Sequence, residues 1–111
     1  MNNTELDLLE GHYIYFTRRD GEYHVRYLLY VDAVGPGPLK SERVLTSGHV
    51  IRFTVPDDGR VKCFTYMDLD RVTVGQETDI HVTDRDGYLG MFREFVRCEG
   101  MYPGQLPDHL R

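Results

Sequence analysis

Apolar and polar residues alternate over long stretches of this chain, and alternation with a period of two predicts β-strands. The pattern is clearest in YHVRYLLYVD (23–32), where one face of the predicted strand carries Tyr23, Val25, Tyr27, Leu29 and Val31. The other face carries His24, Arg26, Leu28, Tyr30 and Asp32. Because both faces become apolar after residue 27, we expect this strand to bend and to serve two sheets or close a small barrel.

Turn signals divide the rest of the β region into further strands. The tetrapeptide RDGE (19–22) predicts a hairpin, because glycine accepts the positive φ that a tight turn needs. A second hairpin is predicted from HVIRFTV (49–55), PDDG (56–59) and RVKCFTYM (60–67), and short strands from 43–45, 71–74 and 79–83. We expect residues 35–42 to form a loop, since their two prolines cannot donate to a strand ladder. Five to six antiparallel strands over residues 12–83 predict a mainly β fold, a small SH3-like barrel.

Two segments have helical character. Asn3 or Thr4 can cap one helical turn over residues 5–10, which Gly11 would end. Residues 84–99 predict a C-terminal helix, because apolar residues recur every three or four positions: Tyr88, Met91, Phe92, Phe95 and Cys98. We expect this apolar stripe to cover an open end of the barrel. Residues 100–111 are punctuated by proline and glycine and predict an extended tail, within a single domain that spans 1–111.

Composition and charge narrow the class of protein. The 111 residues are 41% hydrophobic, enough for a real core, and the formal net charge is −5. Both ends are acidic, whereas residues 12–74 hold nine Lys/Arg and eight Asp/Glu, which argues against non-specific binding to long nucleic acid. No apolar run approaches the roughly 18 residues of a membrane helix, and the polar, acidic N-terminus is unlike a signal peptide. We therefore expect a cytoplasmic protein in which Cys63 and Cys98 are buried thiols.

One motif suggests metal chemistry, the D-x-D at Asp68-Leu69-Asp70. Alternate aspartates on a strand point the same way, and Mg²⁺ prefers carboxylate ligands. In nucleotide-sugar enzymes, however, this pattern lies in a much larger α/β fold, so we expect the two aspartates to mark a strand break before residues 71–74. The five histidines and two cysteines lack the local spacing of zinc sites, and neither serine lies in a nucleophile elbow. The sequence therefore predicts no enzyme, no metal and no cofactor.

The remaining feature is a strand face that combines positive charge with aromatic rings. Its predicted ligand-binding residues are Arg26, Arg52, Lys62, Arg71 and Tyr66. Arginine beside aromatic side chains on a small barrel can hold single-stranded nucleic acid or another anion, through stacking and bidentate hydrogen bonds. The alternative is a solvated face whose basic residues pair with acids on neighbouring strands.

The order of features over residues 12–74 resembles the WYL domain, a small SH3/Sm-like barrel found in bacterial regulators. Three stretches carry the resemblance: YIYFTRRDGEYHVRY, HVIRFTVPDDGRVKCF and Leu69-Asp70-Arg71-Val72. The tripeptide that names the family is not present, and His49-Val50-Ile51 stands near its place. The resemblance implies a regulatory module that binds a ligand or nucleic acid through basic residues, with Arg26 and Arg71 at the matching positions.

Three functions from different classes are consistent with these features. The first is a non-enzymatic binding or regulatory module that recognises an anionic ligand or short nucleic acid through the basic and aromatic face. The second is a protein inhibitor or adaptor, of the kind that a phage or mobile element encodes, which binds a host protein. The third is a small metal-dependent enzyme that uses Asp68 and Asp70. In addition, an apolar sheet edge near residues 71–74 suits pairing with a second copy of the chain.

Overall fold

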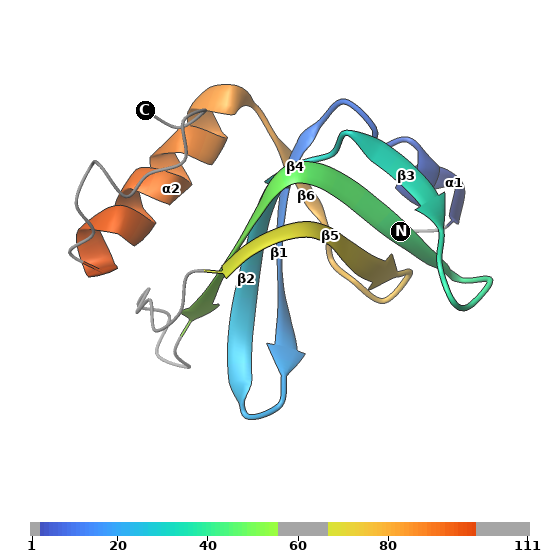
Figure 1. Ribbon diagram of the computed structural model, residues 1–111, viewed down its shortest axis with the longest axis horizontal. Coiled ribbons are helices and arrows are strands. Elements are labelled where there is room, and N and C mark those ends of the chain that lie inside the picture. Colours follow the sequence, from blue (N-terminus) through green and yellow to red (C-terminus); the bar gives the residue numbers. More distant parts are fainter. Residues whose placement is uncertain (1–2, 56–66, 100–111) are drawn as a thin grey trace.

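The computed structural model describes residues 3–55 and 67–99, with side chains described for residues 5–53, apart from residue 49, and for 70–94. The described part is mainly β, with all strand pairs antiparallel, as the alternation predicts. A short helix precedes the strands and a longer helix follows them (Figure 1). The elements are α1 (Asn3–Asp7), β1 (Tyr13–Asp20), β2 (Tyr23–Tyr30), β3 (Ala33–Pro36), β4 (Glu42–Val55), β5 (Met67–Gly75), β6 (His81–Thr83) and α2 (Arg85–Glu99).

The hairpin predicted at residues 19–22 is confirmed. Strand β1 pairs with β2 along its whole length, and the turn lies between Asp20 and Tyr23. Gly21 takes a positive φ of 63°, which a residue with a Cβ rarely adopts. Helix α1 spans Asn3–Asp7 and not the expected residues 5–10, so Asn3 and Thr4 lie within it. A turn follows it to Gly11, which has a φ of 82° and donates its amide to the Val31 carbonyl oxygen.

Strand β4 organises the sheet. One of its edges pairs first with β3 and then, beyond an irregularity between Thr46 and Val50, with β2. Its other edge pairs with β5. The expectation of separate strands at 43–45 and 49–55 is therefore wrong: a bulge between Thr46 and Val50 lets a single strand bend and continue. The predicted strand at 60–67 lies almost wholly outside the described residues.

Two further sequence expectations are corrected. Gly35 and Pro36, expected in a loop, belong to the short strand β3, and Pro36 is tolerated because it ends a strand that pairs with β4 alone among the described strands. Strand β5 runs from Met67 to Gly75, so the D-x-D does not mark a break in the strand. The sheet runs β3-β4-β2-β1-β6, with β5 on the other edge of β4, and no pairing between described strands joins β5 to β1 or β6.

The main core fills one face of the sheet. Leu6 and Leu9 from the α1 segment pack there against strand residues such as Phe16, Leu29 and Val50, and all of them are buried. Each large apolar side chain buried in this way contributes about 1.5–3 kcal/mol. Of the residues that the alternation assigned to one face, Val25, Tyr27, Leu29 and Val31 belong to this core, whereas Tyr23 beside the hairpin turn is exposed.

Helix α2 covers the opposite face of the sheet. Tyr88 and Phe92 form a second buried cluster with Leu28, Ile51 and Phe53. The predicted C-terminal helix is thus confirmed, but its apolar stripe packs on a sheet face and not on an open barrel end. Figure 1 shows α2 and α1 on opposite sides of the sheet, to the left and to the right. None of the described helices is long and apolar enough to cross a membrane.

Candidate functional site

The sheet register separates two of the predicted ligand-binding residues. Arg26 lies opposite Phe53 on β4, which faces α2. Arg52 lies opposite Tyr27 on β2, which faces the main core. Residues directly opposite on neighbouring strands share a face, so Arg26 and Arg52 lie on opposite faces of the sheet. They do not form one binding surface.

Of the other predicted residues, the structure describes only Arg71. Arg71 lies on β5 opposite Thr46, with its side chain 73% exposed and its Nε 3.7 Å from the carboxylate of Asp70. Lys62 and Tyr66 lie outside the described residues.

A different set of side chains surrounds Arg26. On the face of the β1–β2 hairpin that α2 partly covers, the register places Tyr15 opposite His81, Thr17 opposite Arg26, and Arg19 opposite His24. These positions follow one another along the hairpin toward its turn. We name this set the basic–aromatic strip; its members are Tyr15, Thr17, Arg19, His24, Arg26 and His81.

Short contacts order the strip. The rings of Tyr15 and His81 stack with centroids 5.0 Å apart and an angle of 16° between the ring planes. The Arg26 guanidinium carbon lies 5.7 Å from the Tyr15 ring centre, and the Arg26 Nε donates to the Thr17 hydroxyl at 3.2 Å. Nearer the turn, a guanidinium nitrogen of Arg19 lies 3.3 Å from His24 Nε2. Cation, ring and hydroxyl thus hold one another in fixed positions before any ligand arrives.

The charges of the strip are not neutralised by described carboxylates. Arg18, Arg43 and Arg71 each form an ion pair with a described aspartate. No described carboxylate forms an ion pair with Arg19 or Arg26. At the far end of the strip, His81 Nε2 lies 3.4 Å from Asp79, and the His81 side chain is 51% exposed. The central part of the strip therefore retains cations that can bind an anion.

The other sheet face holds a polar network that sequence reasoning missed. Arg18 donates to the Thr73 carbonyl oxygen at 2.7 Å and lies 3.4 Å from the Tyr27 hydroxyl. That hydroxyl donates to Asp20, whose other oxygen lies 3.7 Å from Arg18 Nε. The guanidinium carbon also lies 4.7 Å from the centre of the Tyr27 ring. The signal in the sequence is the alternation itself, which puts Arg18 on the same face as the core residue Phe16.

The D-x-D has no described partners that would complete a metal site. Asp70 has an 81% exposed side chain beside Arg71, and the side chain of Asp68 lies outside the described part of the chain. Within the described residues, no group of three or more His, Cys, Asp or Glu side chains converges as metal ligands would. The metal hypothesis therefore gains no support from this region.

Comparisons with known proteins identify no relative of this chain. No protein-family model, no curated protein and no solved structure matches the chain.

Proposed function

We propose that this protein is a non-enzymatic binding module, regulatory in role, that recognises an anionic ligand through the basic–aromatic strip. The observation that carries the proposal is the position of Arg19 and Arg26, which share a face with the Tyr15–His81 stack and form no ion pair with a described carboxylate. An arginine without a carboxylate partner keeps its hydrogen-bonding fork for a phosphate or another oxyanion.

The strip suits a nucleotide or a short single-stranded nucleic acid better than a simple anion. One face of the His81 ring is stacked on Tyr15, and the side chain is half exposed, so a nucleobase can extend the stack. Arg26 lies on β2, across β1 from His81 and two residues nearer the hairpin turn, where it can bind a phosphate of a neighbouring nucleotide. Stacking on an aromatic ring contributes about 1–3 kcal/mol per base, and neighbouring arginines bind the backbone.

We further propose that the fold is an SH3-like barrel in which the Arg18 side chain joins β1 to β5 in place of backbone hydrogen bonds between these strands. The bend of β4 brings β5 round toward β1, and the hydrogen bond from Arg18 to Thr73 spans these two strands. The resemblance of residues 12–74 to the WYL domain supports the same reading. On that resemblance Arg71 would join Arg26 as a ligand contact.

A titration of a short labelled oligonucleotide, about eight residues long, at low ionic strength tests the proposal. We expect binding that Arg26→Ala and Arg19→Ala each weaken about tenfold, with the slope of log affinity against log salt falling by about one. Lys40→Ala is the matched control, because it removes the same charge from an exposed turn outside the strip. The absence of binding by the unmodified protein, or an equal loss in all three variants, would refute the proposal.

A further inference from the structure

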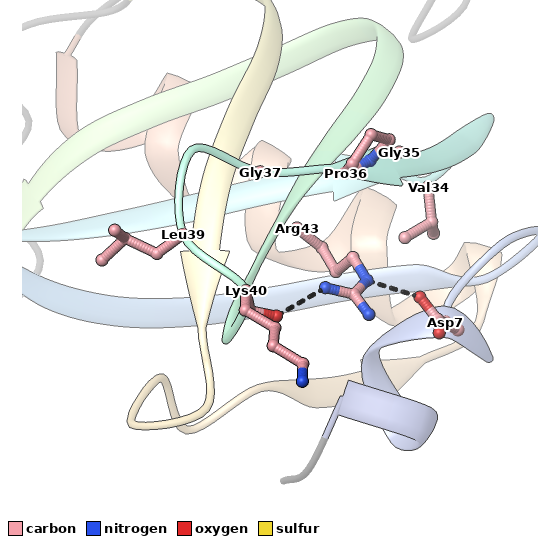
Figure 2. Close-up of a pocket in the computed structure, with 8 residues that line it drawn as sticks. All are labelled: Asp7, Val34, Gly35, Pro36, Gly37, Leu39, Lys40 and Arg43. Carbon is pink, nitrogen blue, oxygen red and sulfur yellow. Dashed lines mark hydrogen bonds and ion pairs between the residues drawn. The ribbon is translucent and has the colours of Figure 1, made fainter.

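A pocket of about 420 Å³ lies between α1 and the turn that joins β3 to β4 (Figure 2). None of its lining residues belongs to β1, β2 or β6, so it is separate from the basic–aromatic strip. Its size lies within the range of small-molecule sites, about 300–1,000 Å³. The pocket therefore offers a second binding site, independent of the function proposed above.

Arg43 forms the polar floor of this pocket and is held in place by three hydrogen bonds. Its Nε donates to Asp7 on α1 at 2.8 Å, and its Nη1 donates to the carbonyl oxygens of Lys40 at 3.0 Å and Glu42 at 2.8 Å. No described residue accepts a hydrogen bond from Nη2. In Figure 2 the side chains of Lys40 and Arg43 extend toward the same side of the turn. A guanidinium fixed in this way can bind an oxyanion without losing further conformational freedom.

The remaining walls are apolar or lack a side chain. Val34, Pro36 and Leu39 supply apolar surface, and Leu39 is 63% exposed. Gly37 has a structural reason to be glycine, because a Cβ there would lie 2.8 Å from Glu42. Gly35 has no such reason: a Cβ there would meet only the Val44 carbonyl oxygen, at 4.0 Å. Glycine within a strand lowers stability, and a Gly35 that the fold does not require keeps this wall of the pocket open.

We propose that this pocket binds a small monocarboxylate with a compact apolar group. The carboxylate accepts a hydrogen bond from Arg43 Nη2, and the apolar group contacts Val34, Pro36 and Leu39. Asp7 already occupies the Nε side of Arg43, so the guanidinium has room for one further oxyanion group, which favours a ligand with a single carboxylate. The hydrogen bonds of Arg43 to backbone carbonyls fix the position of the ligand carboxylate relative to the apolar wall.

An NMR titration of the full chain with 4-methylpentanoate tests the proposal. We expect saturable shifts of the backbone amides of Gly35, Gly37 and Leu39, with an affinity on the order of millimolar for a ligand of this size. The uncharged 4-methylpentanamide and the cationic 4-methylpentylamine are the matched probes, and each should bind at least about tenfold more weakly. Equal responses to all three compounds, or shifts confined to other residues, would overturn the proposal.

Two variants link the binding to this pocket. Gly35→Val adds side-chain atoms to the wall at a strand position that accepts a Cβ, and we expect it to abolish the shifts without lowering the melting temperature. Lys40→Glu reverses one charge in the exposed turn and should weaken carboxylate binding about tenfold, whereas Arg85→Glu at the start of α2 should not. Unchanged binding in both pocket variants would show that the carboxylate binds elsewhere.

Discussion

The guanidinium of Arg18 donates a hydrogen bond to the carbonyl oxygen of Thr73 at 2.7 Å and thereby joins β1 to β5. These two strands share no backbone pairing among the described residues. The same guanidinium also packs on the Tyr27 ring, with its carbon 4.7 Å from the ring centre. A single side chain thus links the two strands across the open side of the sheet.

Replacing Arg18 by methionine removes this link and leaves an apolar stem. Hydrogen bonds from charged groups contribute about 1.5–3 kcal/mol, and the Arg18 side chain is 32% exposed, so we expect a loss of about 1–2 kcal/mol in the free energy of unfolding. Urea denaturation measures the loss. Arg19→Met, on the opposite sheet face and exposed, is the control and should change stability by less than about 0.5 kcal/mol. Equal midpoints for the two variants would contradict a role for Arg18 in closing the sheet.

The same substitution is expected to promote self-association through β5. The Thr73 carbonyl oxygen accepts from Arg18, so losing the arginine leaves this acceptor without its donor on an edge of β5 that pairs with no described strand. Analytical ultracentrifugation over a range of concentrations should show stronger association for Arg18→Met than for the unmodified chain. Adding Thr73→Pro, which blocks strand pairing at this edge, should reverse the effect. Association that Thr73→Pro does not reverse would place the contact elsewhere.

Helix α2 depends on a cap at Asp84. The Asp84 carboxylate accepts a hydrogen bond of 2.7 Å from the Gly87 amide, and its carbonyl oxygen accepts one from the Tyr88 amide. Asp84→Ala should cost about 1 kcal/mol, because the first-turn amide loses its acceptor. Asp84→Asn retains an acceptor and should stay within a few tenths of the original stability. Thermal denaturation followed by circular dichroism separates the two outcomes, and a neutral Asp84→Ala would show that the cap contributes nothing.

The attachment of α1 should depend on its buried leucines more than on its ion pair. Asp7 pairs with Arg43 at 2.8 Å, but the Asp7 side chain is 53% exposed, so Asp7→Asn should cost at most about 1 kcal/mol. Leu6 is fully buried in the main core, and Leu6→Ala should cost about 2–5 kcal/mol. Chemical denaturation of both variants measures the difference. The reverse order would mean that electrostatics holds the helix.

Stacking and charge in the basic–aromatic strip can be tested separately. His81→Phe keeps an aromatic ring beside Tyr15, whereas His81→Ala removes it. If a base stacks here, His81→Ala should weaken oligonucleotide binding by about 1–3 kcal/mol, and His81→Phe should largely retain it. Neither change should alter the dependence on salt as Arg26→Ala does. Equal losses for alanine and phenylalanine would argue against stacking.

The sequence predicted those parts of the fold that local patterns determine. Gly11 and Gly21 take the positive φ angles that their turns require, and the alternation along β2 assigns its core face correctly. The helical period of residues 88–92 identifies α2 as amphipathic. The surface on which α2 packs could not be predicted, because an apolar stripe shows that one face of the helix is buried but not which surface buries it.

Register explains most of what the sequence could not predict. Arg26 and Arg52 both lie at polar positions of their own strands, but only the pairing of β2 with β4 shows that they lie on opposite faces. Similarly, the two prolines within residues 35–42 predict a loop, because proline has no amide hydrogen to donate to a strand ladder. In the structure only Pro36 belongs to a strand, and it stands at the strand end. The role of Arg18 could not be predicted, because the sequence does not show which residue of a distant strand lies beside a charged residue on the core face.

The bend in β4 also affects how the domain unfolds. Among the described strands, β4 alone pairs with three others, one on each side of the bulge along one edge and one along the other edge. Either helix can detach, and β6 can fray, while this central ladder stays intact. Releasing β4 would instead free β3 and β5 and separate them from the β1–β2 hairpin at once. The amides of Leu45 and Ile51, buried on its two arms, should therefore exchange with solvent only when the whole domain unfolds.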